Sequence, residues 1–166
     1  IVKTKIKSEG IFDTKTNEYW NEASATMPNV QAGSIIEYRY TIKSYNFTKF
    51  PVFHFQYSIP TNFAEYVTEI PEFYIYNPIT TGFAKVNSKS EIGFGYQNYD
   101  DEHNQGLHMS YKQINTVHTS ENVVALKSED FVDNIENYRG SIDYELEKTR
   151  FPEVPEKIYT QTWEDV

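Results

Sequence analysis

Residues 27–40 read MPNVQAGSIIEYRY, a stretch that joins a turn to a strand pattern. Pro28 fixes its own φ angle and Gly33 can take positive φ without steric cost, so we predict a turn that redirects the chain. After the turn, apolar and polar residues alternate, and the apolar positions include Ile36, Tyr38 and Tyr40. Alternation with period two predicts a β-strand that buries this face and leaves the other in water.

The same alternation recurs along the chain, and Pro60 and Pro71 close two of the runs because proline cannot donate to a strand ladder. We predict strands at residues 1–6, 34–44, 52–59, 63–70, 73–76, 82–86, 92–96, 107–117 and 141–146. Residues 128–138 fit one short helix or a pair of turns that begins after Ser128. The predicted fold is therefore mainly β: an antiparallel β-sandwich of about eight or more strands with at most one or two short helices.

The amino-acid composition agrees with a β protein and makes some classes of binding partner unlikely to be recognised. The chain has 166 residues, of which 16% are aromatic, and its formal net charge is -9. Aromatic residues favour strands, and an acidic chain offers no broad positive field to nucleic acid, so no nucleic-acid partner is expected. No run of about eighteen apolar residues is present, so no membrane span is expected in this chain.

The residues that carry chemistry are sparse. With no cysteine in the chain, thiolate catalysis and thiolate metal sites are excluded. Four histidines lie near serines or acids, but no Gly-x-Ser-x-Gly motif accompanies them, and we expect His108 and His118 to be surface residues. We therefore predict no catalytic residues and no cofactor. The weak metal candidate is the acidic loop that contains Asp100, Asp101 and Glu102, which lacks the spacing of a calcium loop.

Several segments together resemble a known family, the domain of unknown function found N-terminal to the transglutaminase-like core of large bacterial cell-envelope proteins. The resemblance is carried by residues 27–38, 55–60, 65–66, 69–72, 125–129, 137–139 and 141–146. It implies a β-sandwich accessory domain over residues 1–151 that lacks its leading strands, followed over residues 152–166 by a proline-spaced linker and the start of the transglutaminase-like domain. It also implies a periplasmic, cell-envelope or extracellular location. No catalytic residue of the family corresponds to a position in this sequence.

Two functions follow as hypotheses. The first is a non-catalytic structural or interaction domain of an exported bacterial transglutaminase-like protein, whose partner is the downstream domain of the same polypeptide or another protein of the envelope. The alternative is a carbohydrate-binding β-sandwich, which requires two or three exposed and nearly coplanar aromatic rings. The sequence does not single out which rings these would be, because the alternating aromatic residues equally suit a core. A third mode, addition of a peptide strand to an open sheet edge, fits a sandwich with missing strands.

Overall fold

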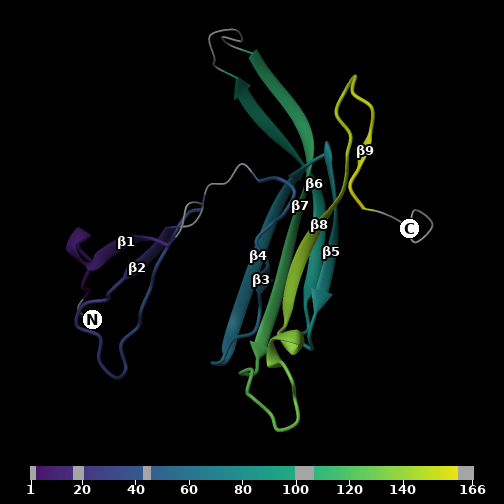
Figure 1. The fold of residues 1–166 in the computed structure, drawn as a ribbon. Helices are drawn as coiled ribbons and strands as arrows, with labels where there is room; N and C mark the ends of the chain where they lie inside the picture. Colours follow the sequence, from purple (N-terminus) through teal and green to yellow (C-terminus); the bar gives the residue numbers. More distant parts are fainter. Residues whose placement is uncertain (1–2, 17–20, 43–45, 100–106, 161–166) are drawn as a thin grey trace. The chain divides into compact units, whose positions relative to one another are not determined.

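The structure is a computed structural model that describes residues 3–16, 21–42, 46–99 and 107–160 (Figure 1). The chain divides into two compact units, Ile1–Lys43 and Ser44–Val166. The sequence led us to expect one domain over residues 1–151, and the division at Lys43 falls inside that range.

The first unit contains a short 3-10 helix, η1 (Ser8–Gly10), and a β-hairpin of β1 (Ile11–Lys15) and β2 (Asn21–Ala25), which pair in antiparallel register. The turn expected from Pro28 and Gly33 is confirmed. Gly33 has a φ of 88°, and the Ser34 N–H donates to the Gln31 carbonyl at 2.9 Å. A positive φ at the third position of a four-residue turn defines a type II turn, which explains the glycine.

The strand expected at residues 34–44 is wrong. Residues 34–42 are assigned to no strand, and no strand pairing joins them to another part of the described chain. Ile36, Tyr38 and Tyr40 were expected in a core but are exposed, with Tyr38 and Tyr40 each 72% accessible. Alternation specifies which side of a strand is apolar; it does not supply the neighbour that the strand requires.

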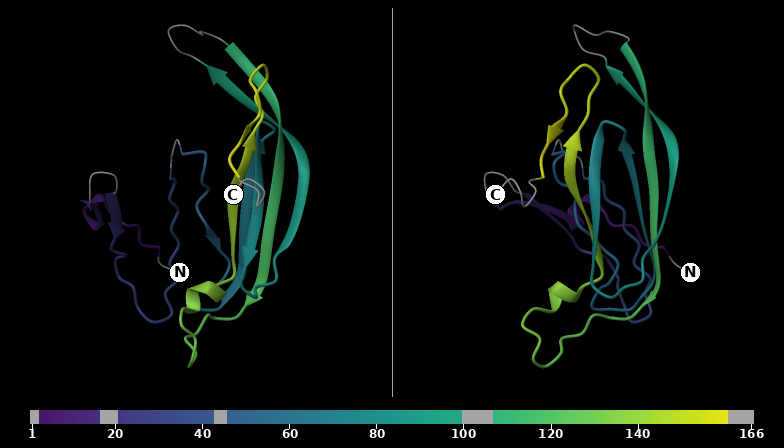
Figure 2. Two further views of the ribbon diagram at one scale, coloured as in Figure 1. Left: turned by 45° about the vertical axis from the view of Figure 1, so that its right-hand side comes forward. Right: turned by 90° about the vertical axis from the view of Figure 1, so that its right-hand side faces the viewer.

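The second unit is an antiparallel β-sandwich whose two sheets lie face to face (Figure 2). One sheet has the order β3 (Phe53–His54), β8 (Ser141–Thr149), β5 (Tyr74–Thr81), and β9 (Lys157–Ile158) also pairs with β8. The other has the order β4 (Thr61–Pro71), β7 (Leu107–Val123), β6 (Asn87–Tyr99). The predicted fold class is confirmed. The described helical segments are η1 and a second 3-10 turn, η2 (Ile135–Tyr138).

The individual strand predictions differ in their outcome. Strands expected at 63–70, 73–76, 92–96, 107–117 and 141–146 are confirmed within β4, β5, β6, β7 and β8. The strand expected at 52–59 is limited to Phe53–His54, so Pro60 precedes β4 and does not end a long strand, while Pro71 is the last residue of β4. Residues 82–86 form no strand. The pair of turns expected in residues 128–138 is present: the Val132 N–H donates to the Glu129 carbonyl, and η2 begins after Asn134, whose side chain accepts the Glu136 N–H.

The core lies between the two sheets. Phe55 and Ile142 are almost fully buried, together with Ala64 and Tyr144. Aromatic rings cross the interface: Phe53 from β3 stacks on Tyr66 from β4 with their ring centroids 4.7 Å apart. Aromatic pairs of this kind join sheets through large apolar area and specific ring geometry.

The segment after β8 turns back toward the sandwich. Lys157 and Ile158 of β9 pair with Thr149 and Lys148 of β8. Glu156 is bound by two cations, with Arg150 Nε at 2.8 Å and Lys148 Nζ at 3.4 Å, and the hydrogen bond from Arg150 lowers the pKa of this carboxyl. Residues 157–158 are thus part of the first sheet. The expectation that a further domain starts within residues 152–166 stays a prediction. Within the described parts of the chain, no helix is long and apolar enough to cross a membrane.

A polar cluster between the sheets as candidate functional site

Four polar side chains from four strands form a connected cluster; three of them are buried between the sheets, and the fourth, Ser88, is exposed on the edge strand β6. Thr68 comes from β4, Ser88 from β6, His118 from β7 and Tyr144 from β8. His118 is only 3% exposed, and Thr68 and Tyr144 are also buried. The register between β6 and β7 explains this arrangement, because it places Ser88 opposite His118, with Thr116 next to His118 on the same face. Tyr144 contacts His118 from the other sheet.

Hydrogen bonds connect the four side chains in a row. Ser88 Oγ lies 2.7 Å from His118 Nδ1, His118 Nε2 lies 2.5 Å from Tyr144 Oη, and Tyr144 Oη lies 3.3 Å from Thr68 Oγ1. A neutral imidazole has one N–H donor and one acceptor nitrogen. The hydrogen bonds can therefore all be donated in the direction from Ser88 to Thr68, or all in the direction from Thr68 to Ser88. In both cases each of the four side chains is hydrogen-bonded.

Burial controls the protonation of this cluster. Removal from water lowers the pKa of His118 and raises the pKa of Tyr144, so the neutral form of each group is favoured. Tyr66, whose ring stacks on His118, has its pKa raised to about 12, first by burial and then by Tyr144 and Asp143. The groups that face His118 are thus neutral near pH 7.

The contact between Ser88 and His118 has the length of a nucleophile and base pair, but its surroundings differ from those of a hydrolase. In a serine triad a carboxylate orients the histidine and stabilises the imidazolium that forms. Here a tyrosine hydroxyl occupies that place, and its raised pKa keeps it uncharged. The arrangement holds four strands of two sheets together through hydrogen bonds and gives the histidine no anionic support.

His118 was expected on the surface but is buried, so this prediction is wrong. Thr116, His118 and Ser120 are all buried, so the even-numbered side of β7 faces inward over this stretch. The signal in the sequence is the run of polar residues at the even positions Thr116, His118 and Ser120. Such residues at alternate positions can hydrogen-bond to side chains of neighbouring strands. Ser90 Oγ and Thr116 Oγ1, 2.9 Å apart, form the next such contact.

Other candidate sites are limited. The acidic loop of Asp100, Asp101 and Glu102 lies outside the described residues, and the residues that are described contain no group of three or more His, Asp or Glu side chains placed to hold a metal. An open pocket of about 570 Å³ lies at the end of β4 and β7 and is lined by Pro60, Thr61, Asn62, Asn122, Val123, Val124, Ala125 and Lys127.

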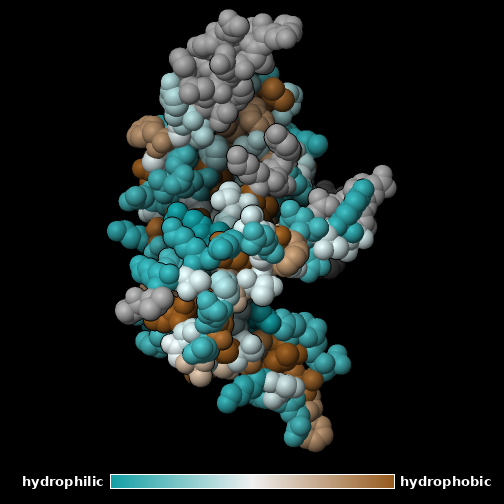
Figure 3. Space-filling model, turned by 90° about the vertical axis from the view of Figure 1, so that its left-hand side faces the viewer, coloured by the Kyte–Doolittle hydropathy of each residue, from teal (hydrophilic) through white to brown (hydrophobic). Residues whose placement is uncertain are grey.

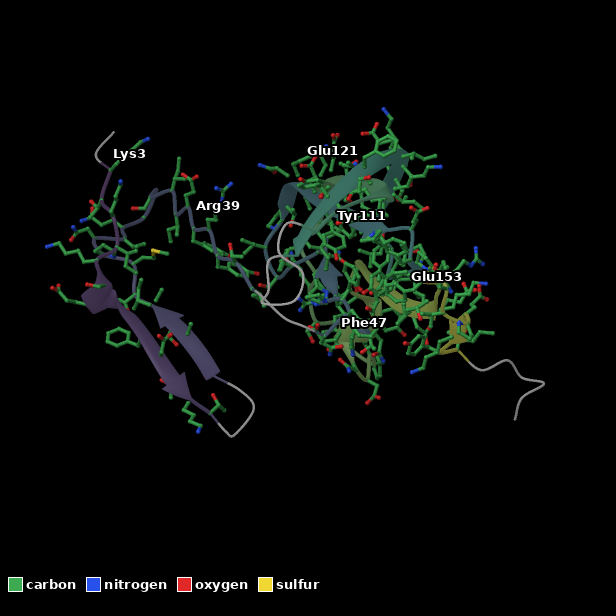
Figure 4. All side chains as sticks on the ribbon, turned by 90° about the horizontal axis from the view of Figure 1, so that it is seen from above. Lys3, Arg39, Phe47, Tyr111, Glu121 and Glu153 are labelled. Atoms are coloured by element: carbon green, nitrogen blue, oxygen red, sulfur yellow. The ribbon has the colours of Figure 1, made fainter. Side chains whose placement is uncertain are left out.

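Exposed aromatic rings occur in two near-parallel pairs among the described residues. Tyr38 and Tyr40 have ring centroids 6.2 Å apart and planes 14° apart, and Phe83 and Tyr138 have centroids 6.2 Å apart and planes 15° apart. On the face shown in Figure 3, apolar residues reach the surface between polar ones. Figure 4 shows Arg39, which lies between the two tyrosines, with its side chain directed away from the backbone trace.

No family model, curated protein or solved structure matches this chain.

Titration of His118 gives the first testable prediction. The pKa of His118 is lowered in the folded protein from its ordinary value of 6.5, so the unfolded chain binds more protons below that pH. The contribution of His118 to stability is therefore fully present above pH 6.5 and is lost as the pH falls through the lower, folded pKa. We expect the free energy of unfolding, measured by urea titration between pH 4 and pH 8, to decrease as the pH is lowered below 6.5.

The variant His118→Gln supplies the control, because glutamine keeps a donor and an acceptor but does not titrate. The difference between the two pH profiles should be flat above pH 6.5 and should slope below it. Two parallel profiles would show that His118 has an ordinary pKa in the folded protein.

Proposed function

We propose that this chain is a non-catalytic interaction domain that supplies residues 34–42 as a strand to a protein partner. The observation that carries the proposal is the exposure of the apolar side of this segment, where Ile36, Tyr38, Tyr40 and Ile42 are all accessible. Exposed apolar residues gathered on one side of an extended chain mark an interaction site. An added strand gains main-chain hydrogen bonds from the sheet that it joins, and its alternate side chains provide specificity.

The alternation of the segment supports strand addition over other binding modes. Glu37 and Arg39 would remain in water on the outer side while the apolar side is covered. The type II turn at Gly33 fixes where the extended segment begins. A strand that pairs along residues 34–42 would bury the side chains that the chain alone leaves in water.

For the partner, we propose the transglutaminase-like domain that follows such domains in the family that the sequence resembles. The resemblance includes residues 27–38, and it implies a location in the bacterial cell envelope. In this proposal the catalytic chemistry belongs to the partner, and this chain positions or stabilises it. The neutral surroundings of His118 support a structural role for the polar cluster.

A binding titration tests the proposal. The partner domain, expressed separately, is titrated into this chain and into two variants with calorimetry as readout. Ile36→Asp places a charge on the apolar side and should weaken binding at least about tenfold, which is about 1.4 kcal/mol. Glu37→Ser changes the adjacent residue on the outer side and should alter the affinity by less than about threefold. Amide exchange should slow at residues 34–42 when the partner is added. Absent binding, equal loss in both variants, or slow exchange before the partner is added would contradict the proposal.

The second candidate function is a carbohydrate-binding module of the cell envelope, favoured by the near-parallel exposed rings of Tyr38 and Tyr40. Such rings can stack on the apolar face of a sugar. The variant Ile36→Asp separates the two candidates because it leaves both rings in place. A glycan ligand would be retained by this variant, whereas a strand partner would be lost.

A further inference from the structure

Phe131 lies in the loop that joins β7 to η2, and it is more exposed than any other large apolar residue that the structure describes. Its relative accessibility is 107%, so water surrounds the whole ring. The loop projects beyond the ends of the strands in Figure 1 and in both views of Figure 2. Apolar surface stabilises a fold only when it is removed from water, so this ring adds nothing to the stability of the sandwich.

The backbone at Phe131 is strained as well. The Val132 N–H donates to the Glu129 carbonyl at 3.4 Å, and Phe131, the third residue of this four-residue turn, has a φ of 68°. Gly33 occupies the equivalent position in the turn at residues 31–34. Glycine and asparagine suit this position, whereas a bulky residue rarely adopts a positive φ. Strain of this kind is concentrated at binding sites, where the conformation itself is needed.

Uncompensated negative charge flanks the exposed ring. Glu129, Asp130 and Asp133 all lie within two residues of Phe131 and are exposed. None of the three forms an ion pair with a lysine or arginine of the described chain, whereas Glu136 is paired with Arg139 at 2.6 Å. Like-charge repulsion therefore disfavours an anionic lipid surface as the partner of this loop, and charge complementarity favours a surface that carries lysine and arginine.

The same end of the sandwich carries further features of an interaction surface. The open pocket described above lies at the base of the loop, because Val124, Ala125 and Lys127 are among the residues that line it. Phe83, which is 87% exposed, stacks on Tyr138 where η2 follows the loop. Exposed aromatic rings of this kind are enriched at protein–protein interfaces.

We propose that Phe131 is the anchor of a protein–protein interaction surface, and that the partner is a protein with an apolar pocket whose rim carries lysine and arginine. In such a pocket the ring leaves water, and the pre-formed turn limits the conformational freedom that is lost on binding. The charges on the rim steer association and fix its orientation. The loop belongs to the second unit and does not include residues 34–42, so this proposal stands whether or not the function proposed above is correct.

The variant Phe131→Asn tests first whether the fold needs the ring. Asparagine tolerates a positive φ at the third position of the turn, so the midpoint of urea unfolding should equal or exceed that of the unmodified chain. A lower midpoint would show that the ring stabilises the fold, and the proposal would then be wrong.

A phage-displayed library of disulfide-closed random peptides, selected for binding to the full chain, is the probe for a protein partner. We expect the selected peptides to be enriched in apolar residues together with lysine and arginine. By calorimetry, Phe131→Asn should weaken their binding at least about tenfold, as expected for an anchor residue. The matched variant Phe94→Asn removes another exposed phenylalanine, on the ribbon of β6 and β7 beyond the end of β4. It should change the affinity by less than about threefold.

A chain with both Asp130→Asn and Asp133→Asn tests the charge of the rim while it keeps the ring. Binding of the selected peptides should weaken at least about twofold and should depend less on salt. Vesicles of phosphatidylcholine test for an uncharged lipid surface and should bind neither the unmodified chain nor Phe131→Asn. Selected peptides without basic residues, failure to select any peptide that depends on Phe131, or binding to these vesicles that requires Phe131 would overturn the proposal.

Discussion

Replacing Phe55 with alanine is expected to lower the free energy of unfolding of the sandwich by about 3–5 kcal/mol, the usual loss for a fully buried phenylalanine. Phe55 has no accessible surface and packs on Phe53, with their ring centroids 5.0 Å apart. Its N–H also donates to the Gly140 carbonyl at 2.8 Å, which ties the segment after β3 to the start of β8. Removing the ring leaves a cavity in the centre of the core, because neighbouring strands cannot close over it.

The control for Phe55→Ala is Phe83→Ala. Phe83 is 87% exposed and stacks on Tyr138 at the surface. Its removal should cost less than about 1 kcal/mol, since surface substitutions remove little buried area. Urea unfolding followed by far-ultraviolet circular dichroism measures both values. Losses of similar size in the two variants would mean that the core is not centred on Phe55.

The second large effect is expected from Gly82→Ala. Gly82 has a φ of +74°, and an added Cβ would lie 2.5 Å from the Tyr138 carbonyl oxygen and 2.6 Å from that of Arg139. The methyl group therefore meets backbone atoms that must move together with η2. We expect a loss of about 3 kcal/mol or more, because the strain of left-handed backbone, about 1–2 kcal/mol, adds to this displacement.

Gly33→Ala is the matched control for Gly82→Ala. Gly33 also has a positive φ, of +88°, but an added Cβ would meet no atom within 4 Å. This variant should show the conformational strain alone, about 1–2 kcal/mol. Amide exchange of β5 and β8 reports on Gly82→Ala, and exchange of β1 and β2 reports on Gly33→Ala. Equal effects would show that strain, and not the contact with residues 138–139, sets the requirement for glycine at position 82.

The fold class could be predicted from the sequence because alternation and proline placement act locally. β4 ends at Pro71 as expected, and Pro78 lies in the edge strand β5, where a missing N–H costs no ladder bond. Apolar and polar residues alternate only weakly in residues 82–86, and these residues form no strand. Gly82 instead packs closely against the backbone of residues 138–139. Local pattern carries no information about that distant backbone.

The candidate site could not be predicted in the same way. The cluster depends on the register between β6 and β7 and on the facing of two sheets, both of which join residues far apart in sequence. His118 lies 26 residues from Tyr144, and no local motif links them. Similarly, residues 34–42 carry a strong strand pattern, but whether a neighbouring strand exists is a property of the whole assembly.

The position of β8 has a consequence for how the protein is made. β8 is the central strand of its sheet and pairs with β3, β5 and β9, yet it occupies residues 141–149. During synthesis β3 and β5 leave the ribosome long before the strand that joins them exists. Tyr144 reaches His118 and Thr68 equally late. The sandwich therefore closes only after nearly all of its strands have been translated, and until then its apolar strands depend on chaperones or on rapid synthesis to avoid pairing with other chains.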